Sequence, residues 1–441
     1  MQTERIRDVI RYIKKFRGTT IVIRLDDDVV DSPLFAGHMH DLALLYETGI
    51  RIVIVPGAQN HISKVLDAYQ VKWDYRNGIR TTSEEGMNFI KMAAFDVSNR
   101  IMSQLSAEKL TAVIGNWVRA RGRGIIDGFD FGSAGVVEKV QLESLTMALE
   151  DGFIPIIPCI GWTMTGKPYN ISSTELAVAA AVALKAEKLF FMGSGAFISV
   201  DDYQIPPQAA LSPEGRLAAI AIDDIDSFIE LNRDVVNHNC PTIELADLLL
   251  QGKDACSRGV TRSHILDGDI EGVIPAEIFS DLGSGTMIFK NNYGTFRTMT
   301  RDDIPSVLSL MNPFVEDGSL LPRTSEELET LSGEFTVYEI DGGIRACAAL
   351  HAYSDKNMAE IAGLAVDDAY AHMGIGPRLM ELLIEKGKKE GFDSVFVLTT
   401  KAADWFERFG FKSAEIDLLP VKRREKWTPN RASRMLILKF R

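Results

Sequence analysis

A regular alternation of short apolar runs and longer helical stretches constrains the fold more than any other feature of the chain. Short apolar runs, most of them rich in valine and isoleucine, recur up to about residue 288: TIVIRL (20–25), IRIVIVPG (50–57), LTAVIG (110–115), FIPIIPCIG (153–161) and KLFFMG (188–193). Helical stretches at 86–106 and 174–186 separate several of them. The pattern predicts an α/β fold, with an open, mostly parallel sheet and helices on both of its faces.

The pattern changes after a short polar break, FKNNYGT, at residues 289–295. Strand-like runs then follow one another directly before a helical run at 374–391. We therefore expect two domains, an α/β domain over 1–288 and an α+β domain over 294–441. Within the first domain, the glycine-punctuated segment 122–141 is expected to form a hairpin at the sheet edge.

Composition and charge narrow the class of protein. The 441 residues are 46% hydrophobic and 25% charged, which is typical of a folded globular chain. A net charge of −13 leaves no basic excess for nucleic-acid phosphates, so no nucleic-acid partner is expected. Four scattered cysteines favour a reducing compartment without a metal site, and the longest apolar run is too short to span a membrane. We expect a cytoplasmic protein.

The N-terminal residues 4–17 predict an amphipathic helix. Its apolar stripe consists of Ile6, Val9, Ile10, Ile13 and Phe16. The stripe must pack on another surface, either on its own domain or on a second subunit.

A candidate anion-binding turn lies in the second domain, after an apolar strand that ends at Val366. Gly374 and Gly376 allow close approach to the backbone, and the helix that starts there offers N–H groups to a pyrophosphate. Taken by itself, a Gly-x-Gly pair more often marks an ordinary turn.

The sequence around this turn resembles the GNAT superfamily of N-acetyltransferases, whose signature is Gln/Arg-x-x-Gly-x-Gly/Ala after a central strand. AHMGIG (371–376) fits, except that Ala371 replaces the Arg or Gln. The resemblance implies acetyl-coenzyme A as cosubstrate. Its pantetheine would pair with the backbone of Leu364, Ala365 and Val366. Its pyrophosphate would be bound by the N–H groups of His372, Met373, Gly374, Ile375 and Gly376.

Further stretches resemble the acetyltransferase domain of the N-acetylglutamate synthase family. They are CAALHAY (347–353), AEIAGLAV (359–366), VFVLTTKAADWFERFGF (395–411) and LPVKRREKWTPNRASRMLIL (419–438). They cover nearly the whole domain, and the last two are more specific than Gly-x-Gly. WFERFGF departs from the family's order, and Arg434 stands for a final lysine.

This resemblance implies L-glutamate as the acceptor, and its two carboxylates need cations. Arg323 and Arg431 lie where the family places its glutamate-binding arginines, although Arg431 also follows a basic run typical of a solvated tail. Thr399 and Lys401 fall where polar contacts are expected. His351 stands where some relatives have a lysine.

The chemistry requires a base for the amine and a proton donor for the departing thiolate. Glu360, on the central strand, is the candidate base; otherwise it is a solvent-facing strand residue. Many relatives use a tyrosine as the acid, but Phe406 occupies that position here. Ser433 or water would supply the proton, and the N–H of Val366 would bind the oxyanion.

The first domain resembles the amino-acid kinase family, specifically N-acetylglutamate kinase. YIKKFRGTTIVIRL, NGIRTTSE, YNISSTELAVAAAVALKAEKL and FSDLGSGTMI occur in the family's order. The kinase's first-strand lysine and glycines are replaced by Arg24, Leu25 and the acidic turn 26–28. VPGAQN keeps only Gly57 of a glycine-rich turn, and Thr174 stands near the kinase's aspartate. We expect the kinase fold without kinase activity, since phosphoryl transfer needs cations and backbone donors.

Arginine-sensitive members of this family share an N-terminal helix with a tyrosine, here Tyr12, and a later segment that matches 263–288. The resemblance implies that His264, Glu277 and the backbone near Gly283 bind L-arginine, with Tyr12 closing the site. His264 is otherwise an ordinary loop histidine. The helix would join subunits into a homo-oligomer, and the resemblance suggests a hexamer.

The sequence therefore favours an N-acetylglutamate synthase-like enzyme of arginine biosynthesis, with arginine as its feedback effector. Two rivals stay open. A bifunctional synthase and kinase is opposed by the lost lysines and glycines. An arginine-sensing protein with a decayed transferase is supported by Ala371, His351 and WFERFGF.

Overall fold

The structure is a computed structural model that divides into two compact units, residues 12–291 and 292–441. The sequence predicts domains over 1–288 and 294–441. The described residues are 13–14, 16–76, 78–206, 209–212, 214–238, 240–279, 284–290, 294–340, 343–368, 370, 375–425, 427 and 433–440. Their side chains are described as well, except those of residues 236–244. No helix among these residues is long and apolar enough to cross a membrane.

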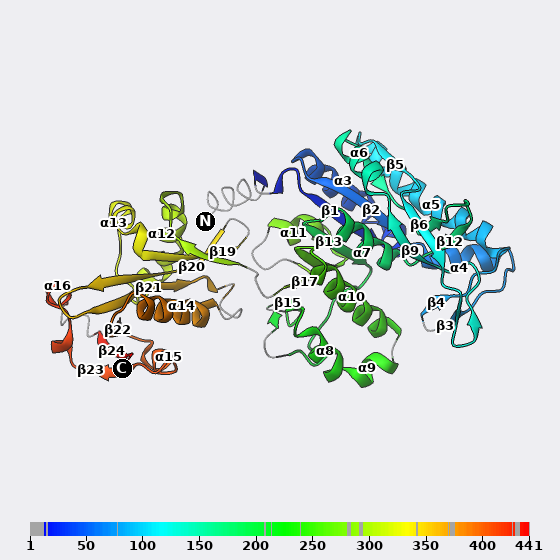
Figure 1. The fold of residues 1–441 in the computed structure, drawn as a ribbon. Coiled ribbons are helices and arrows are strands. Elements are labelled where there is room, and N and C mark those ends of the chain that lie inside the picture. The colour runs from blue at the N-terminus through cyan, green and yellow to red at the C-terminus, as the bar shows by residue number, and fades with distance from the viewer. Residues whose placement is uncertain are drawn as a thin grey trace. The chain divides into compact units, whose positions relative to one another are not determined.

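The first unit is built on a large twisted sheet, and the predicted mostly parallel α/β fold is confirmed (Figure 1). Its strands run, from one edge to the other, β14 (Ala210–Leu211), β15 (Leu217–Ala221), β17 (Thr286–Phe289), β16 (Arg262–Asp267), β13 (Lys188–Gly193), β1 (Thr20–Leu25), β2 (Arg51–Pro56), β10 (Ile154–Ile156) and β5 (Ala112–Ile114). Only β14–β15 and β16–β17 pair antiparallel. TIVIRL forms the central β1, which is buried on both sides because helices cover both faces.

Helices cover the two faces of this sheet in two groups with separate apolar cores. One group is α2 (Asp27–Asp31), α3 (Phe35–Glu47), α4 (Gln59–Ala68), α5 (Gly86–Ala107) and α11 (Val273–Phe279). The other is α6 (Leu142–Glu150), α7 (Ser173–Ala183), α8 (Ile225–Leu231) and α10 (Cys240–Ser257), with α9 (Arg233–His238) between the last two. In α5, Ile90, Ala94, Val97 and Ile101 are buried at helical spacing, so this helix packs along one stripe.

Two details of the first unit differ from the sequence prediction. The turn expected after β1 is the short helix α2, which begins at Asp27. The segment 122–141 pairs as a hairpin through β6 (Val118–Gly122) and β9 (Gly135–Val140), but not at the edge of the main sheet. It joins β11 (Ile160–Trp162) and β12 (Pro168–Asn170) in a separate four-stranded sheet. Gly161 allows this pairing, because a Cβ there would lie 2.4 Å from Cβ of Ala120.

Small hairpins complete the first unit. They are β3 (Tyr75–Arg76) with β4 (Ile79–Arg80), and β7 (Ile125–Ile126) with β8 (Phe129–Asp130). Of the N-terminal helix expected over 4–17, most residues, including Tyr12, lie outside the described part of the chain. Phe16 is described and is 1% exposed in the core of its own unit.

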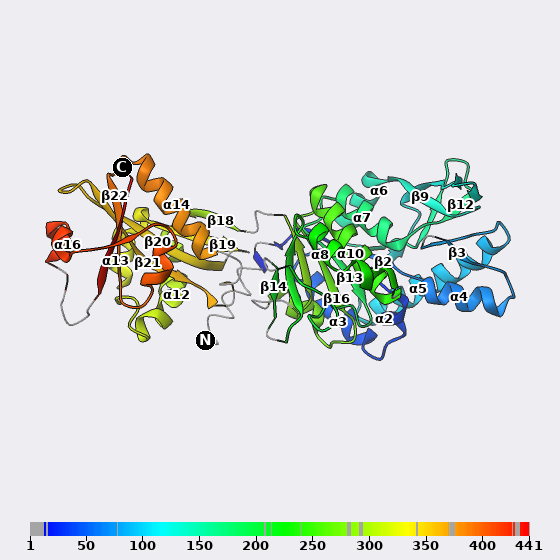
Figure 2. The ribbon, with the colours of Figure 1, turned by 90° about the horizontal axis from the view of Figure 1, so that it is seen from below.

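The second unit is a seven-stranded mixed sheet, as expected for its α+β class (Figure 2). Its order is β18 (Thr295–Thr298), β19 (Phe335–Ile340), β20 (Gly343–Tyr353), β21 (Met358–Val366), β22 (Ser394–Thr399), β24 (Arg434–Lys439) and β23 (Lys412–Ala414). Every neighbouring pair is antiparallel except β21–β22.

Helices lie on both faces of the second sheet. On one face α12 (Ile304–Glu316) and α13 (Ser325–Thr330) cover a core around Phe335 and Ala349. On the other, α14 (Ile375–Lys389) buries Leu379, Met380 and Leu383. The shorter elements are η1 (Arg301–Asp303), η2 (Ser332–Glu334), α15 (Ala403–Glu407), η4 (Ile416–Leu418) and α16 (Val421–Arg424).

Candidate functional site

The strands β21 and β22 pair only at their beginnings. Their parallel register ends at Glu360 opposite Phe396, whereas β21 continues to Val366 and β22 to Thr399. No further pair joins these two strands within the described residues, so β21 offers an open edge from about residue 361 onward. The backbone of such an edge can bind an extended chain. Three predicted cofactor residues lie along this edge: Leu364, Ala365 and Val366.

The start of α14 lies beside the end of this open edge. Ile375 and Gly376 are the first two residues of the helix and are buried, and a Cβ on Gly376 would lie 3.6 Å from Cγ2 of Val366. N–H groups in a first helical turn attract anions. The open edge and a helix N-terminus therefore adjoin one another. The other predicted pyrophosphate residues, His372, Met373 and Gly374, lie outside the described residues.

Glu360, the candidate base, is buried and forms a partly buried ion pair. Its Oε2 accepts hydrogen bonds from Arg423 Nε (2.7 Å) and from the Tyr353 hydroxyl (3.1 Å), and its side chain is 4% exposed. Burial raises the pKa of Tyr353, and the neighbouring Glu360 carboxylate raises it further. Glu360 thus fastens α16 to the sheet, and a role as base remains a prediction.

His351 lies directly across from Glu360 on β20, so both side chains project from one face of the sheet. Its Nδ1 contacts the carboxylate of Glu334, and its Nε2 lies 3.2 Å from Nη2 of Arg323. The structure therefore brings three predicted site residues together: Arg323, His351 and Glu360. Arg323 also lies over the ring of Phe335, 5.5 Å from its centroid.

The two polar residues predicted after β22 have partners of their own. Thr399 is 8% exposed, and its hydroxyl accepts a hydrogen bond from the N–H of Ala402. Lys401 donates to the carbonyl and the carboxylate of Asp317 at the end of α12. Hydrogen bonds from Ser319 and Lys401 lower the pKa of Asp317 to about 2. Thr399 therefore orients the turn before α15, and Lys401 ties that turn to α12.

Ser433, the candidate acid, precedes β24, and its hydroxyl accepts a hydrogen bond from Nε1 of Trp427 (3.2 Å). A hydroxyl that accepts in this way still carries a proton that it can donate. Arg431 lies outside the described residues. Phe406 is buried in the apolar core under α14, which fits its expected lack of acid chemistry.

The predicted arginine-binding residues of the first unit form a buried polar cluster with Lys188. His264 Nδ1 lies 2.5 Å from Oε1 of Glu277, and His264 Nε2 lies 3.5 Å from Nζ of Lys188. The other oxygen of Glu277 accepts the N–H groups of Ser284 (2.6 Å) and Gly285 (2.8 Å). Gly283 itself, like Tyr12, lies outside the described residues.

Charges in this cluster fix the protonation of its members. Burial, with the nearby Lys188 ammonium, lowers the pKa of His264 to about 4. Burial opposes ionisation of Glu277, but hydrogen bonds from His264 and two backbone N–H groups outweigh it and lower its pKa. The cluster therefore holds a neutral imidazole and an ionised carboxylate at neutral pH. Phe16 closes one side, since Lys188 Nζ lies 5.7 Å from its ring centroid.

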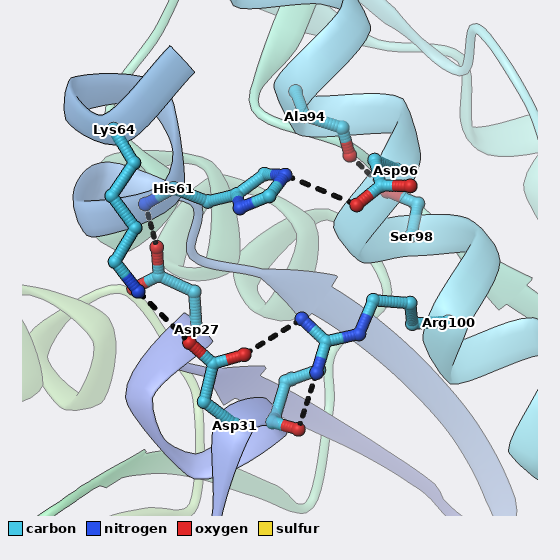
Figure 3. A network of polar contacts seen from close by, with 9 residues as sticks. Asp27, Asp31, His61, Lys64, Ala94, Asp96, Ser98 and Arg100 are labelled. Atoms are coloured by element: carbon cyan, nitrogen blue, oxygen red, sulfur yellow. Dashed lines mark hydrogen bonds and ion pairs between the residues drawn. The ribbon is translucent and has the colours of Figure 1, made fainter. Parts of the chain in front are cut away.

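The acidic stretch after β1 is satisfied by its own chain. Asp26 pairs with the buried Arg24 at 2.5 Å, and a Cβ on Gly57 would lie 2.4 Å from Asp26 Oδ1. Asp27 is 2% exposed and accepts the N–H of His61 in the first turn of α4 (2.6 Å; Figure 3). Carboxylates thus lie where strand ends and a helix N-terminus would otherwise bind an anion.

Other charges around α2 also disfavour phosphate. Figure 3 shows Asp31 between Lys64 (3.2 Å) and Arg100 (2.8 Å). A pocket of about 640 Å³ beside α2 has four carboxylates and one ammonium among its lining residues, from Asp28, Asp31, Asp67, Asp269 and Lys64. Burial raises the pKa of Asp28, and the neighbouring Asp27 carboxylate raises it further. An ATP phosphate chain would meet repulsion here.

Comparison with known proteins decides the family. Residues 15–236 match the amino acid kinase family, and residues 304–411 match the acetyltransferase (GNAT) family. The amino-acid acetyltransferase of Pasteurella multocida (strain Pm70) is 33% identical over 431 residues, which are 97% of this chain and 95% of that one. The chain belongs to the amino-acid acetyltransferase family. A further member, from Escherichia coli (strain K12), is 29% identical and matches 98% of this chain and 97% of its own.

Solved structures of this acetyltransferase family match over both units. N-acetylglutamate synthase from Neisseria gonorrhoeae, complexed with coenzyme A and L-arginine, aligns with a TM-score of 0.76 at 29% identity, covering 99% of each chain. The same enzyme complexed with coenzyme A and N-acetyl-glutamate aligns with a TM-score of 0.59 at 31% identity, covering 100% of this chain and 99% of that one. The resemblance to N-acetylglutamate synthases and the two-part fold are thereby confirmed.

Three residues of this acetyltransferase that contact the predicted sites are not indicated by the sequence. Arg423 lies in the basic run that precedes Arg431, Glu334 belongs to none of the quoted motifs, and Lys188 begins the apolar run KLFFMG. A lysine or arginine within a buried strand, such as Lys188 in β13, indicates a buried polar partner, because such charges are rarely buried unpaired.

Proposed function

We propose that this acetyltransferase transfers the acetyl group of acetyl-coenzyme A to the amino group of L-glutamate, which gives N-acetyl-L-glutamate and coenzyme A. The reaction is the first step of arginine biosynthesis. The observation that carries the proposal is the open edge of β21 beside the start of α14. His351 on β20 and Glu360 on β21 project from one face of the sheet, and Arg323 lies beside His351. The Neisseria synthase, complexed with coenzyme A and N-acetyl-glutamate, supports it.

Each candidate residue has a role in this proposal. Pantetheine pairs with the edge at 364–366, and the backbone N–H groups of 372–376, the last two of which begin α14, bind the pyrophosphate. Arg323 and Arg431 bind the glutamate carboxylates, because a guanidinium matches a carboxylate in charge and geometry. Thr399 and Lys401 contribute polar groups to the glutamate site, and Ser433 donates a proton to the departing thiolate.

The first unit has a regulatory role in this proposal. L-Arginine binds at the cluster of His264 and Glu277 and modulates the acetyltransferase as the end product of its pathway. Support comes from the buried carboxylate of Glu277 and from the arginine-complexed Neisseria synthase. The N-terminal helix would join subunits into a homo-oligomer, a hexamer by resemblance, and the enzyme would act in the cytoplasm.

Thiol release from acetyl-coenzyme A, measured with a panel of amino acids, tests the substrate. We expect fast release with L-glutamate, and release at least about tenfold slower with L-glutamine, which lacks one charged hydrogen bond, and with the shorter L-aspartate. Equal rates for glutamate and glutamine would contradict a site that binds two carboxylates. Release with no amino acid specificity would contradict the proposed function as a whole.

A further inference from the structure

His351 is held between a carboxylate and a guanidinium, and its partners determine where its proton lies. A guanidinium only donates hydrogen bonds, so the Nε2 atom that faces Arg323 at 3.2 Å must carry a lone pair. The proton of the neutral imidazole is then on Nδ1, where it is donated to Glu334. Some catalytic histidines are oriented by a carboxylate in this way and act as general bases.

Glu360, in contrast, is already committed to other groups. The same oxygen accepts from Arg423 and from Tyr353, and the side chain is 4% exposed. To take a proton from a substrate, this carboxylate would have to give up part of a buried ion pair. The His351 side chain is 13% exposed. Its Nε2 faces the guanidinium of Arg323, which a substrate carboxylate would attract away from the imidazole.

We propose that His351 Nε2 is the general base that deprotonates the substrate amine, with Glu334 as the residue that positions it. The inference rests on the proposed function. In an α-amino acid the ammonium and the α-carboxylate are attached to the same carbon. A substrate whose carboxylate takes the Nη2 donor of Arg323 therefore brings its ammonium next to the lone pair that Arg323 releases.

The steps balance without a further reactant. The ammonium gives one proton to His351 Nε2, and the free amine attacks the thioester carbonyl, forming a C–N bond and an oxyanion. The oxyanion collapses, the C–S bond breaks, and coenzyme A leaves as a thiolate. The second amine proton ends on the thiolate sulfur, through Ser433 or water. The imidazolium then returns its proton to solvent.

Several charged and titratable groups surround His351 and would affect the pH dependence of the reaction. Glu334 comes from η2, Arg323 from the segment before α13, Glu360 from the facing position on β21, and Tyr353 from β20 itself; Arg423 reaches the same face through Glu360. Model imidazoles titrate near pH 6.5 and model carboxylates near pH 4.3. The acid limb of the activity profile can therefore distinguish a histidine base from a glutamate base.

The test measures kcat and kcat/KM for glutamate between pH 5 and 9 in the full-length protein and in variants at His351, Glu334, Glu360 and His40, with coenzyme A binding by calorimetry as a check on folding. In His351→Gln, the acid side of the pH profile should no longer show a change of slope (the break), and kcat should fall about 10²- to 10⁴-fold. Glu334→Gln should keep the break but move it to lower pH, because the charge that favours imidazolium is gone. Glu360→Gln should keep the break in place, even if its rate falls.

The matched control is His40→Gln, since His40 pairs with Glu108 on the exposed surface of the first unit (3.0 Å) and should change nothing. Partial rescue of His351→Ala by added imidazole would support the proposal further. A His351→Gln variant that keeps the break and stays within about threefold of the wild-type kcat would overturn it, as would a break lost in Glu360→Gln. If the wild type itself does not acetylate glutamate, the proposed function fails instead.

Discussion

Replacing Arg423 by methionine should destabilise the acetyltransferase unit far more than the same change at Arg424, its neighbour on α16. The Arg423 side chain is 14% exposed and pairs with the 4% exposed Glu360, whereas Arg424 is 46% exposed. Removing one partner of a buried pair costs about 3–5 kcal/mol, because the other charge stays buried. Since Tyr353 still donates to Glu360, we expect about 2–4 kcal/mol for Arg423→Met and under about 0.5 kcal/mol for Arg424→Met.

Differential scanning calorimetry of the full-length protein measures this difference. Coenzyme A raises the Tm of the unit that binds it, which identifies the relevant transition. A loss of 2–4 kcal/mol lowers Tm by roughly 4–16 °C in a unit of this size. Adding Glu360→Gln to Arg423→Met removes the uncompensated charge and should restore part of the loss. Equal Tm values for the two arginine variants, or a double variant no more stable than Arg423→Met, would refute the buried pair.

Four further predictions concern the other clusters. Arg323→Ala should raise the KM for glutamate roughly 10- to 150-fold with unchanged coenzyme A binding, measured by kinetics and calorimetry. Glu277→Ala should abolish the response to arginine, a coupling of about 1–3 kcal/mol, while uninhibited turnover persists. Because the pKa of His264 is lowered to about 4, the unfolded chain binds the proton first, so the free energy of unfolding should fall between about pH 6.5 and 4, and less in His264→Gln. Gly57→Ala should cost about 1–3 kcal/mol in urea unfolding, because its methyl group would displace the Asp26 carboxylate.

Each of these predictions has an outcome that contradicts it. Unchanged glutamate kinetics would remove Arg323 from the site, and a normal arginine response in Glu277→Ala would remove that carboxylate from the effector site. Identical pH dependence in wild type and His264→Gln would mean that another group titrates. Gly37→Ala is the control for Gly57→Ala, since nothing lies within 4 Å of its added Cβ. Equal losses in both glycine variants would contradict the crowding argument.

The fold followed from the sequence because its signals are local or shared with a family. The short apolar runs form β1, β2 and β13, and the change of pattern near residue 290 marks a second unit. The site was predicted less completely. Arg423 reaches Glu360 across 63 positions of sequence, and its run VKRREK gives no sign that one of its cations is buried. Such a contact depends on where α16 packs, which no local pattern encodes.

The acidic stretch 26–28 shows the same limit. The sequence predicts an acidic turn, 26–28, in place of the kinase's phosphate-binding glycines. In the structure Asp27 starts a helix, and its carboxylate accepts an N–H of α4. Asp26 neutralises Arg24. The charge pattern was informative, but the pairing that stabilises it depends on strands and helices brought together by the fold.

The most direct test of the proposed function identifies the product itself. The full-length protein is incubated with acetyl-coenzyme A labelled with ¹³C in the acetyl group and with an equimolar mixture of amino acids, with and without L-arginine, and the products are resolved by NMR. The account predicts that the label appears on N-acetyl-L-glutamate ahead of every other amino acid, and that arginine changes its rate of formation. Label that stays on coenzyme A, or that spreads evenly over the mixture, would contradict it.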